Sequence, residues 1–138
     1  MVRIKSNNGF SLVETIIAVS VFSVGVLGVL TMFYSGIKLM KSSQSFTVAD
    51  QLAKEKIEEI VSLDYDDVLV GTFIESSLAH PFESYRRQSY IVYVNPLSGL
   101  QESLTDTGIK KIEVTVKWKS VFNWTDRNTK ITTLIFKK

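Results

Sequence analysis

Few residues of this chain have side chains that could do chemistry. The 138 residues include no Cys and one His, His80. Without Cys, thiolate zinc sites, iron–sulfur clusters, disulfides and cysteine nucleophiles are excluded for these residues. Ser76 and Ser77 lie near His80 in sequence, but no nucleophile motif surrounds them. We therefore expect no enzyme activity, no cofactor and no metal site.

One carboxylate stands out by its position. Glu14 is the only charged side chain between Lys5 and Lys38, and it directly precedes residues 15–37, a run of 23 residues without a charge. A carboxylate that reaches the centre of a bilayer costs about 2–3 kcal/mol or more. The simplest reading places Glu14 in the headgroup zone, at a helix N-terminus that favours an anion.

The uncharged run predicts a membrane-spanning helix. As a helix it would be roughly 34 Å long, which exceeds a hydrocarbon core of about 30 Å. A buried helix is the first alternative, although so small a domain could hardly surround it. A cleaved secretory signal is the second, but its apolar core should be about 7–15 residues long. Basic residues flank the run on both sides, so the positive-inside rule does not settle its orientation.

The helix is predicted to continue beyond the membrane to about residue 63. An apolar stripe with helical spacing includes Ala49, Leu52, Ala53, Lys56, Ile57, Ile60 and Val61. Three carboxylates in the segment Asp64–Asp67 oppose the helix macrodipole and favour an end to the helix there. A calcium loop at this acidic segment is an alternative, but the EF-hand spacing and its Gly are missing.

From residue 68 the pattern changes to the period of a β-strand. Apolar residues alternate with polar ones between Ile112 and Trp118, which is typical of a half-buried strand. Further strands are predicted over 129–136, 89–95 and, more weakly, 68–74. The sequence therefore predicts an α+β fold, in which the amphipathic half of a long N-terminal helix covers a small antiparallel meander.

The N-terminus carries the most specific motif. A short basic leader, MVRIKSNNG, is followed by Phe10-Ser-Leu-Val-Glu14 and then by the apolar run. This arrangement resembles the prepilin signal of type IV pilins and of the pseudopilins of secretion and competence systems. The resemblance implies cleavage between Gly9 and Phe10 by a prepilin peptidase, which also N-methylates Phe10. It further implies that Glu14 pairs with the terminal amine of a neighbouring subunit.

The resemblance also implies an organisation of the chain. Residues 1–9 would be the leader, 10–37 the transmembrane and fibre-core half of the helix, 38–67 its amphipathic half with the following turn, and 68–138 an antiparallel β-sheet head. Such a protein would begin in the cytoplasmic membrane with a single span and later join a fibre outside the cytoplasm.

The implied function is that of a fibre subunit, most similar to a minor pilin. Its partners would be the peptidase, other pilin subunits, an assembly ATPase with its membrane platform, and the bilayer before assembly. A secretion or competence pseudopilin is the alternative within the family, and an uncleaved membrane-anchored binding domain is the alternative outside it. Nucleic acid is a weaker candidate partner, suggested by Tyr85-Arg86-Arg87 with Tyr90 and Tyr93.

Overall fold

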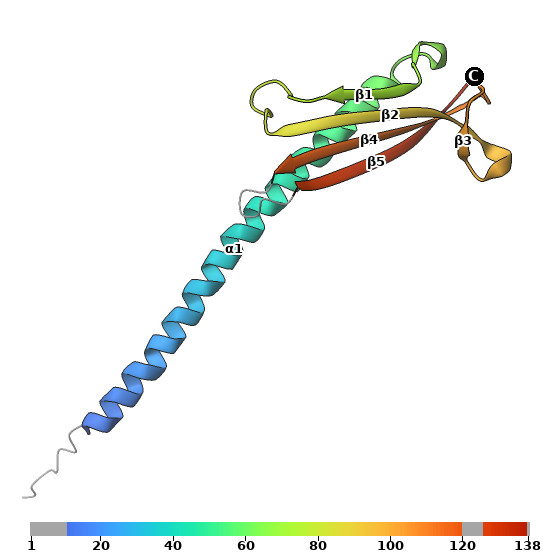
Figure 1. Cartoon of the computed structure of the whole chain (residues 1–138). Helices are drawn as coiled ribbons and strands as arrows, with labels where there is room; N and C mark the ends of the chain where they lie inside the picture. The colour runs from blue at the N-terminus through green and yellow to red at the C-terminus, as the bar shows by residue number, and fades with distance from the viewer. Residues whose placement is uncertain (1–10, 120–125, 138) are drawn as a thin grey trace, which may run out of the picture. The chain divides into compact units, whose positions relative to one another are not determined.

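A computed structural model describes residues 11–119 and 126–137. Contacts divide the chain into two units, Met1–Met40 and Lys41–Lys138, and we describe each unit by itself. The elements are one long N-terminal helix and a small antiparallel sheet, and the amphipathic part of the helix packs on that sheet (Figure 1). The α+β fold class predicted from the sequence is confirmed.

Helix α1 runs from Leu12 to Val61 without a break. The carbonyl of Ser11 accepts the first helical hydrogen bond, from the Thr15 amide at 3.1 Å. Beyond Val61 the chain turns into a short 3-10 helix, η1, Tyr65–Asp67. The acidic residues predicted to end the helix therefore form a new turn, as expected for carboxylates at the negative end of a helix dipole.

The second unit contains all the strands. They are β1 (Gly71–Glu75), β2 (Tyr85–Asn95), β3 (Gln101–Ser103), β4 (Ile109–Lys119) and β5 (Asp126–Phe136). The sheet order is β1-β2-β4-β5, with β3 paired to β2, and every pairing is antiparallel.

Strand β3 was not predicted from the sequence, because it is a three-residue excursion from the meander. It follows the 3-10 helix η2, Pro96–Ser98, and a reversal in which Gly99 and Leu100 both have positive φ. Strand β1 begins at Gly71, three residues later than the start predicted at Val68. Val68 is instead buried in the core directly after η1.

The core of this unit lies between helix α1 and the inner face of the sheet. The helix contributes Ala49, Leu52, Ala53 and Ile60, and the sheet contributes alternate residues of β4, which are Ile112, Val114, Val116 and Trp118. Two residues of the predicted stripe differ from expectation. Val61 is 48% exposed, because the helix ends there. The half-buried Lys56 forms ion pairs with Glu59 and Glu75.

Two buried cations join the helix and its following turn to the sheet. Arg87 of β2 donates to the Leu52 carbonyl at 3.0 Å and to the Glu75 carboxylate at 2.6 Å. Lys110 of β4 donates to the carbonyl oxygens of Tyr65 and Val68, at 2.6 and 2.7 Å. Because each buried charge has several acceptors, its desolvation is compensated.

The charge state of Glu75 follows from this network. Burial opposes its ionisation, but hydrogen bonds and positive charge from Arg87 and from Lys56 outweigh burial and hold the pKa of Glu75 below its ordinary value. A carboxylate with a lowered pKa in the folded state stabilises the fold above its ordinary pKa. That contribution is lost as the pH falls through the lower, folded-state pKa.

We predict that Glu75→Gln lowers the free energy of unfolding by about 1 kcal/mol at pH 7. Urea unfolding of the full chain in detergent, followed by Trp fluorescence, measures the change. The difference from wild type should shrink as the pH falls below the ordinary pKa of a glutamate. Glu55→Gln, on the exposed helix face, is the matched control and should have little effect. If Glu75→Gln lowers the free energy of unfolding equally at neutral and acidic pH, the stabilising role of the ionised Glu75 carboxylate is contradicted.

Candidate membrane and assembly segment

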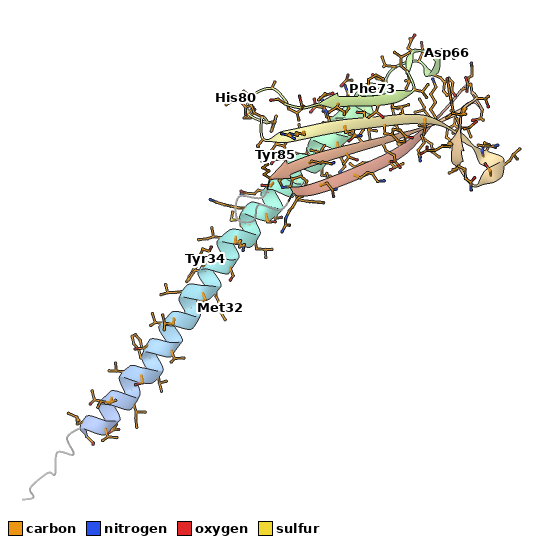
Figure 2. All side chains as sticks on the ribbon, in the orientation of Figure 1. Met32, Tyr34, Asp66, Phe73, His80 and Tyr85 are labelled. Carbon is orange, nitrogen blue, oxygen red and sulfur yellow. The ribbon has the colours of Figure 1, made fainter. Side chains whose placement is uncertain are left out.

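The candidate functional site is the first part of helix α1, which we call the apolar segment, residues 12–37. Every residue of this segment is exposed within the chain, and its large side chains project from the helix, as Met32 and Tyr34 do in Figure 2. Among the described residues, α1 is the one helix long and apolar enough to cross a membrane. Water is an unfavourable surrounding for so much apolar surface, so lipid or other protein must cover it.

Four of the six hydroxyl groups of the apolar segment, all but those of Tyr34 and Ser35, donate within the helix. Ser20 and Ser23 donate to the carbonyl oxygens four residues earlier, at 2.8 and 2.7 Å. Thr15 and Thr31 donate to the carbonyl oxygens of Ser11 and Gly28, at 3.3 and 2.7 Å. These hydroxyls therefore need no water, which makes them compatible with a hydrocarbon environment.

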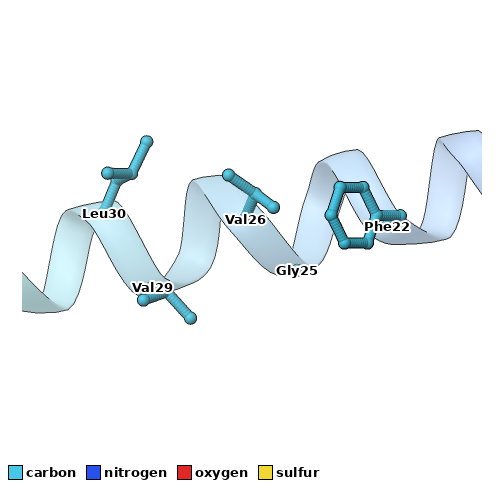
Figure 3. Close-up of a pocket in the computed structure, with 5 residues that line it drawn as sticks. All are labelled: Phe22, Gly25, Val26, Val29 and Leu30. Atoms are coloured by element: carbon cyan, nitrogen blue, oxygen red, sulfur yellow. The ribbon is translucent and has the colours of Figure 1, made fainter.

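A shallow hollow interrupts the apolar segment at Gly25. It is bordered by Phe22, Val26, Val29 and Leu30, so its walls are entirely apolar (Figure 3). A Cβ placed on Gly25 would meet nothing within 4 Å. No described contact inside the chain therefore requires a glycine here. Small residues on membrane helices allow another helix to approach closely.

Glu14 lies in the first turn of α1 and is exposed. The free amide groups and the dipole of the helix N-terminus favour an anion at this position. No ion pair among the described residues includes Glu14. Of the three residues predicted to take part in processing and assembly, it is the one that the structure describes, because Gly9 and Phe10 lie outside the described residues.

The weaker candidate sites are explained by local structure. In the acidic segment, Asp66 pairs with Lys137 at 3.0 Å. Within residues 11–119 and 126–137, no group of three or more His, Cys, Asp or Glu side chains could hold a metal ion. His80 lies 2.8 Å from a carboxylate oxygen of Glu83, an ordinary surface contact.

The aromatic and basic residues of β2 do not form one surface. Tyr85 and Arg87 are buried against the helix, and only Arg86 of this tripeptide is exposed. A stacking platform for a single-stranded nucleic acid needs exposed aromatic faces beside the cations. The structure therefore removes Tyr85 and Arg87 from the proposed nucleic-acid surface.

Comparison with known proteins adds one match. Residues 4–30 match the family model of the prokaryotic N-terminal methylation motif. This match supports the assignment of the chain as a type IV pilin-family protein. The match includes Gly9, Phe10 and Glu14 together with most of the apolar segment. No curated protein and no solved structure matches the chain.

The matched motif bears on the role of the apolar segment. It implies processing by a prepilin peptidase and assembly with other pilins. An apolar N-terminal helix joined to such a motif fits a membrane-anchored pilin. The exposed apolar residues and the internally bonded hydroxyls described above supply the physical basis of that anchoring.

We predict that Val26→Lys combined with Val29→Lys prevents stable membrane insertion, because each central lysine costs about 3 kcal/mol. Alkaline extraction of membranes that contain the full chain measures the effect, and the variant should move to the soluble fraction. Ser43→Lys with Thr47→Lys adds the same charge outside the apolar segment and should remain with the membrane. Retention of both variants would show that the segment is not the anchor.

Proposed function

We propose that this chain is a fibre subunit of a type IV pilus, present as a minor pilin, and that it is not an enzyme. The observation that carries the proposal is Glu14, the sole charged side chain of the apolar segment, which lies in the first turn of helix α1. Cleavage between Gly9 and Phe10 would make Glu14 the fifth residue of the mature chain. The same cleavage would create a new amine at Phe10, which the peptidase would then methylate.

The surroundings of Glu14 would differ between the two stages of this function. In the bilayer, the headgroup zone and the helix N-terminus can accommodate the carboxylate. In a fibre, the apolar segments would leave lipid and pack against one another. A carboxylate buried there without a partner would be expensive, so the Phe10 amine of a neighbouring subunit would lower the cost and fix the axial register.

The route to the fibre involves several partners. The prepilin peptidase would cut the leader on the cytoplasmic side and leave α1 as a single span in the cytoplasmic membrane. An assembly ATPase and its membrane platform would then move the subunit out of the membrane into a pilus outside the cytoplasm. Other pilin subunits would replace lipid around the apolar segment, and the hollow at Gly25 offers a place for a neighbouring helix to approach.

Two other functions compete with this proposal. A pseudopilin of a type II secretion or competence system would use the same N-terminus, and it differs in the machine to which it belongs. An uncleaved, membrane-anchored binding domain would use the apolar segment as a permanent anchor. The position of Glu14 favours an assembling subunit over this second alternative, because a permanent anchor has no need of a carboxylate there.

We predict that the protein isolated from its native membranes begins at Phe10. Intact-mass analysis should show loss of residues 1–9 and an added methyl group, since the peptidase both cuts and methylates. A Gly9→Val variant should retain the leader, because the added side chain blocks close approach to the scissile bond. An uncut wild-type chain in membranes with active peptidase would favour the permanent-anchor alternative.

We also predict that Glu14→Ala is inserted and cleaved normally but enters fibres at least about tenfold less than wild type, because a neighbour's amine is left unpaired in an apolar core. Quantitative mass spectrometry of purified filaments measures this ratio, and wild-type abundance relative to the main subunit distinguishes a minor pilin from a major one. Glu55→Ala removes an exposed carboxylate from the same helix and should assemble normally. Equal assembly of Glu14→Ala and Glu55→Ala would contradict the proposed pairing.

A further inference from the structure

Strand β5 forms an open edge of the sheet. In the order β1-β2-β4-β5 it has β4 as its one neighbour (Figure 1). Alternate residues of an antiparallel strand direct their amide and carbonyl groups to opposite sides, so about half of the backbone groups of β5 point away from β4. No described hydrogen bond joins the backbone of β5 to an element other than β4. These groups are therefore available to a further strand.

The second half of this edge has none of the usual protection. Proteins prevent association at an open edge with a proline, a bulge, a charge or a covering element. All eleven residues of β5 pair one to one with β4, so the strand has no bulge. It contains no proline, and residues 131–136, ITTLIF, contain no charge. The strand at the opposite edge, β1, has only five residues.

A groove runs along this unprotected half of β5. We call it the edge groove, and its volume is about 710 Å³. One wall consists of Leu134, Ile135, Phe136 and Lys137, and no described residue of β4 borders the groove. A hollow on one face of a strand would be bordered by alternate residues, so four consecutive residues indicate that this groove follows the edge.

The opposite wall of the edge groove comes from the end of helix α1 and the turn that follows it. Val61 and Leu63 contribute apolar side chains, and residues 64–67, which include η1, contribute three carboxylates. All these residues belong to the second unit, Lys41–Lys138. The groove is therefore defined within one unit of the structure.

Apolar side chains in the edge groove are only partly covered. Phe136 is 61% exposed, and Val61 and Leu63 are 48% and 50% exposed. A strand added to β5 would direct every second side chain toward one face, where it could cover these residues. Main-chain hydrogen bonds and the filling of such hollows are the sources of affinity and specificity when a peptide adds to a sheet edge.

The charges of the edge groove favour a cation. Asp64 and Asp67 are exposed, and no ion pair among the described residues includes either of them. Asp66 is paired with Lys137. The last turn of α1 contains no basic residue, although the negative end of a helix dipole is stabilised by one. A positively charged occupant would thus complement two carboxylates and a helix C-terminus.

The same charges argue against a second copy of this chain as the occupant. If two copies paired their β5 strands antiparallel at the edge groove, the two-fold symmetry would bring their acidic turns toward each other. Like charges that meet across an interface are costly. A segment of a different protein, with basic side chains, avoids this repulsion.

We propose that the edge groove docks an extended segment of another protein, which adds to β5 as a further strand and carries basic and apolar side chains. A basic side chain would lie against Asp64 and Asp67, and an apolar one against Phe136. The inference concerns the second unit alone and does not rest on cleavage of the leader or on Glu14. Within the proposed function, the segment would belong to a different fibre subunit.

The test uses the full chain in nonionic detergent and capped seven-residue peptides that carry a fluorophore. Valine alternates with lysine in one peptide and with glutamate in the other. Fluorescence anisotropy should show binding of the lysine peptide and none of the glutamate peptide. A third peptide, the lysine sequence with every amide N-methylated, cannot donate main-chain hydrogen bonds and should bind at least about tenfold more weakly.

Hydrogen exchange measured by mass spectrometry identifies the site. Bound lysine peptide should slow the exchange of residues 131–136 at least about tenfold, because the outward amides of β5 become hydrogen-bonded. The amides of β1, at the other edge, should exchange at an unchanged rate. Protection of β1 in place of β5 would contradict the proposal.

Matched variants test the charge of the edge groove. Asp64→Asn with Asp67→Asn should weaken binding of the lysine peptide about fivefold. Glu55→Gln with Glu83→Gln removes the same charge from exposed positions outside the groove and should bind the peptide as the wild type does. Thermal unfolding of each variant checks that its fold is retained.

Three results would overturn the inference. They are no binding of the lysine peptide at about 1 mM, equal binding of the lysine and glutamate peptides, and binding that leaves the exchange of residues 131–136 unchanged. Each of these results leaves the proposed function intact, because cleavage at Gly9 and assembly through Glu14 are measured separately.

Discussion

Exposed apolar surface on the first part of helix α1 determines what must surround this chain. Residues 12–37 form a helix that is apolar on all sides, and its side chains are exposed within the described chain. The core of the β-sheet unit does not cover these side chains, because that core is built from residues after Lys41. The segment must be covered by lipid, by other helices or by each in turn, and a pilin-type life cycle supplies both.

The two parts of helix α1 differ in how their apolar side chains can be covered. The first part has no charge after Glu14 and bonds four of its hydroxyl groups internally, which suits hydrocarbon on every side. The second part buries only one face, and buried Arg87 holds that face to the sheet through the Leu52 carbonyl and Glu75. Lys110 fixes the turn after the helix in a similar way. The charge pattern thus marks where the helix changes from apolar on every side to apolar on one face. The sheet supplies the residues that pack on that face.

Sequence patterns predicted what depends on periodicity. The alternation from Ile112 to Trp118 predicted the central strand, and the stripe with Leu52 and Ile60 predicted the helix face that packs on it. Strand β3 was not predicted, because three residues are too few to show a periodic pattern. The burial of Arg87 and Lys110 was not predicted, because charged residues are ordinarily expected to be exposed. Their hydrogen-bond acceptors lie far away in sequence and become known only from the structure. The edge groove likewise depends on the sheet order and on segments that lie far apart in sequence.

At the N-terminus, the charge pattern and the motif single out Gly9, Phe10 and Glu14, and the structure describes only Glu14 of these three residues. Whether the apolar segment is covered can be tested most directly by its accessibility to a thiol reagent, because the chain has no native Cys to react in the background. Single-cysteine chains Val26→Cys and Ser76→Cys are exposed to a membrane-impermeant maleimide, in isolated membranes and on purified fibres. We expect Ser76→Cys to be labelled in both preparations and Val26→Cys in neither. Equal labelling of the two positions in either preparation would contradict this expectation.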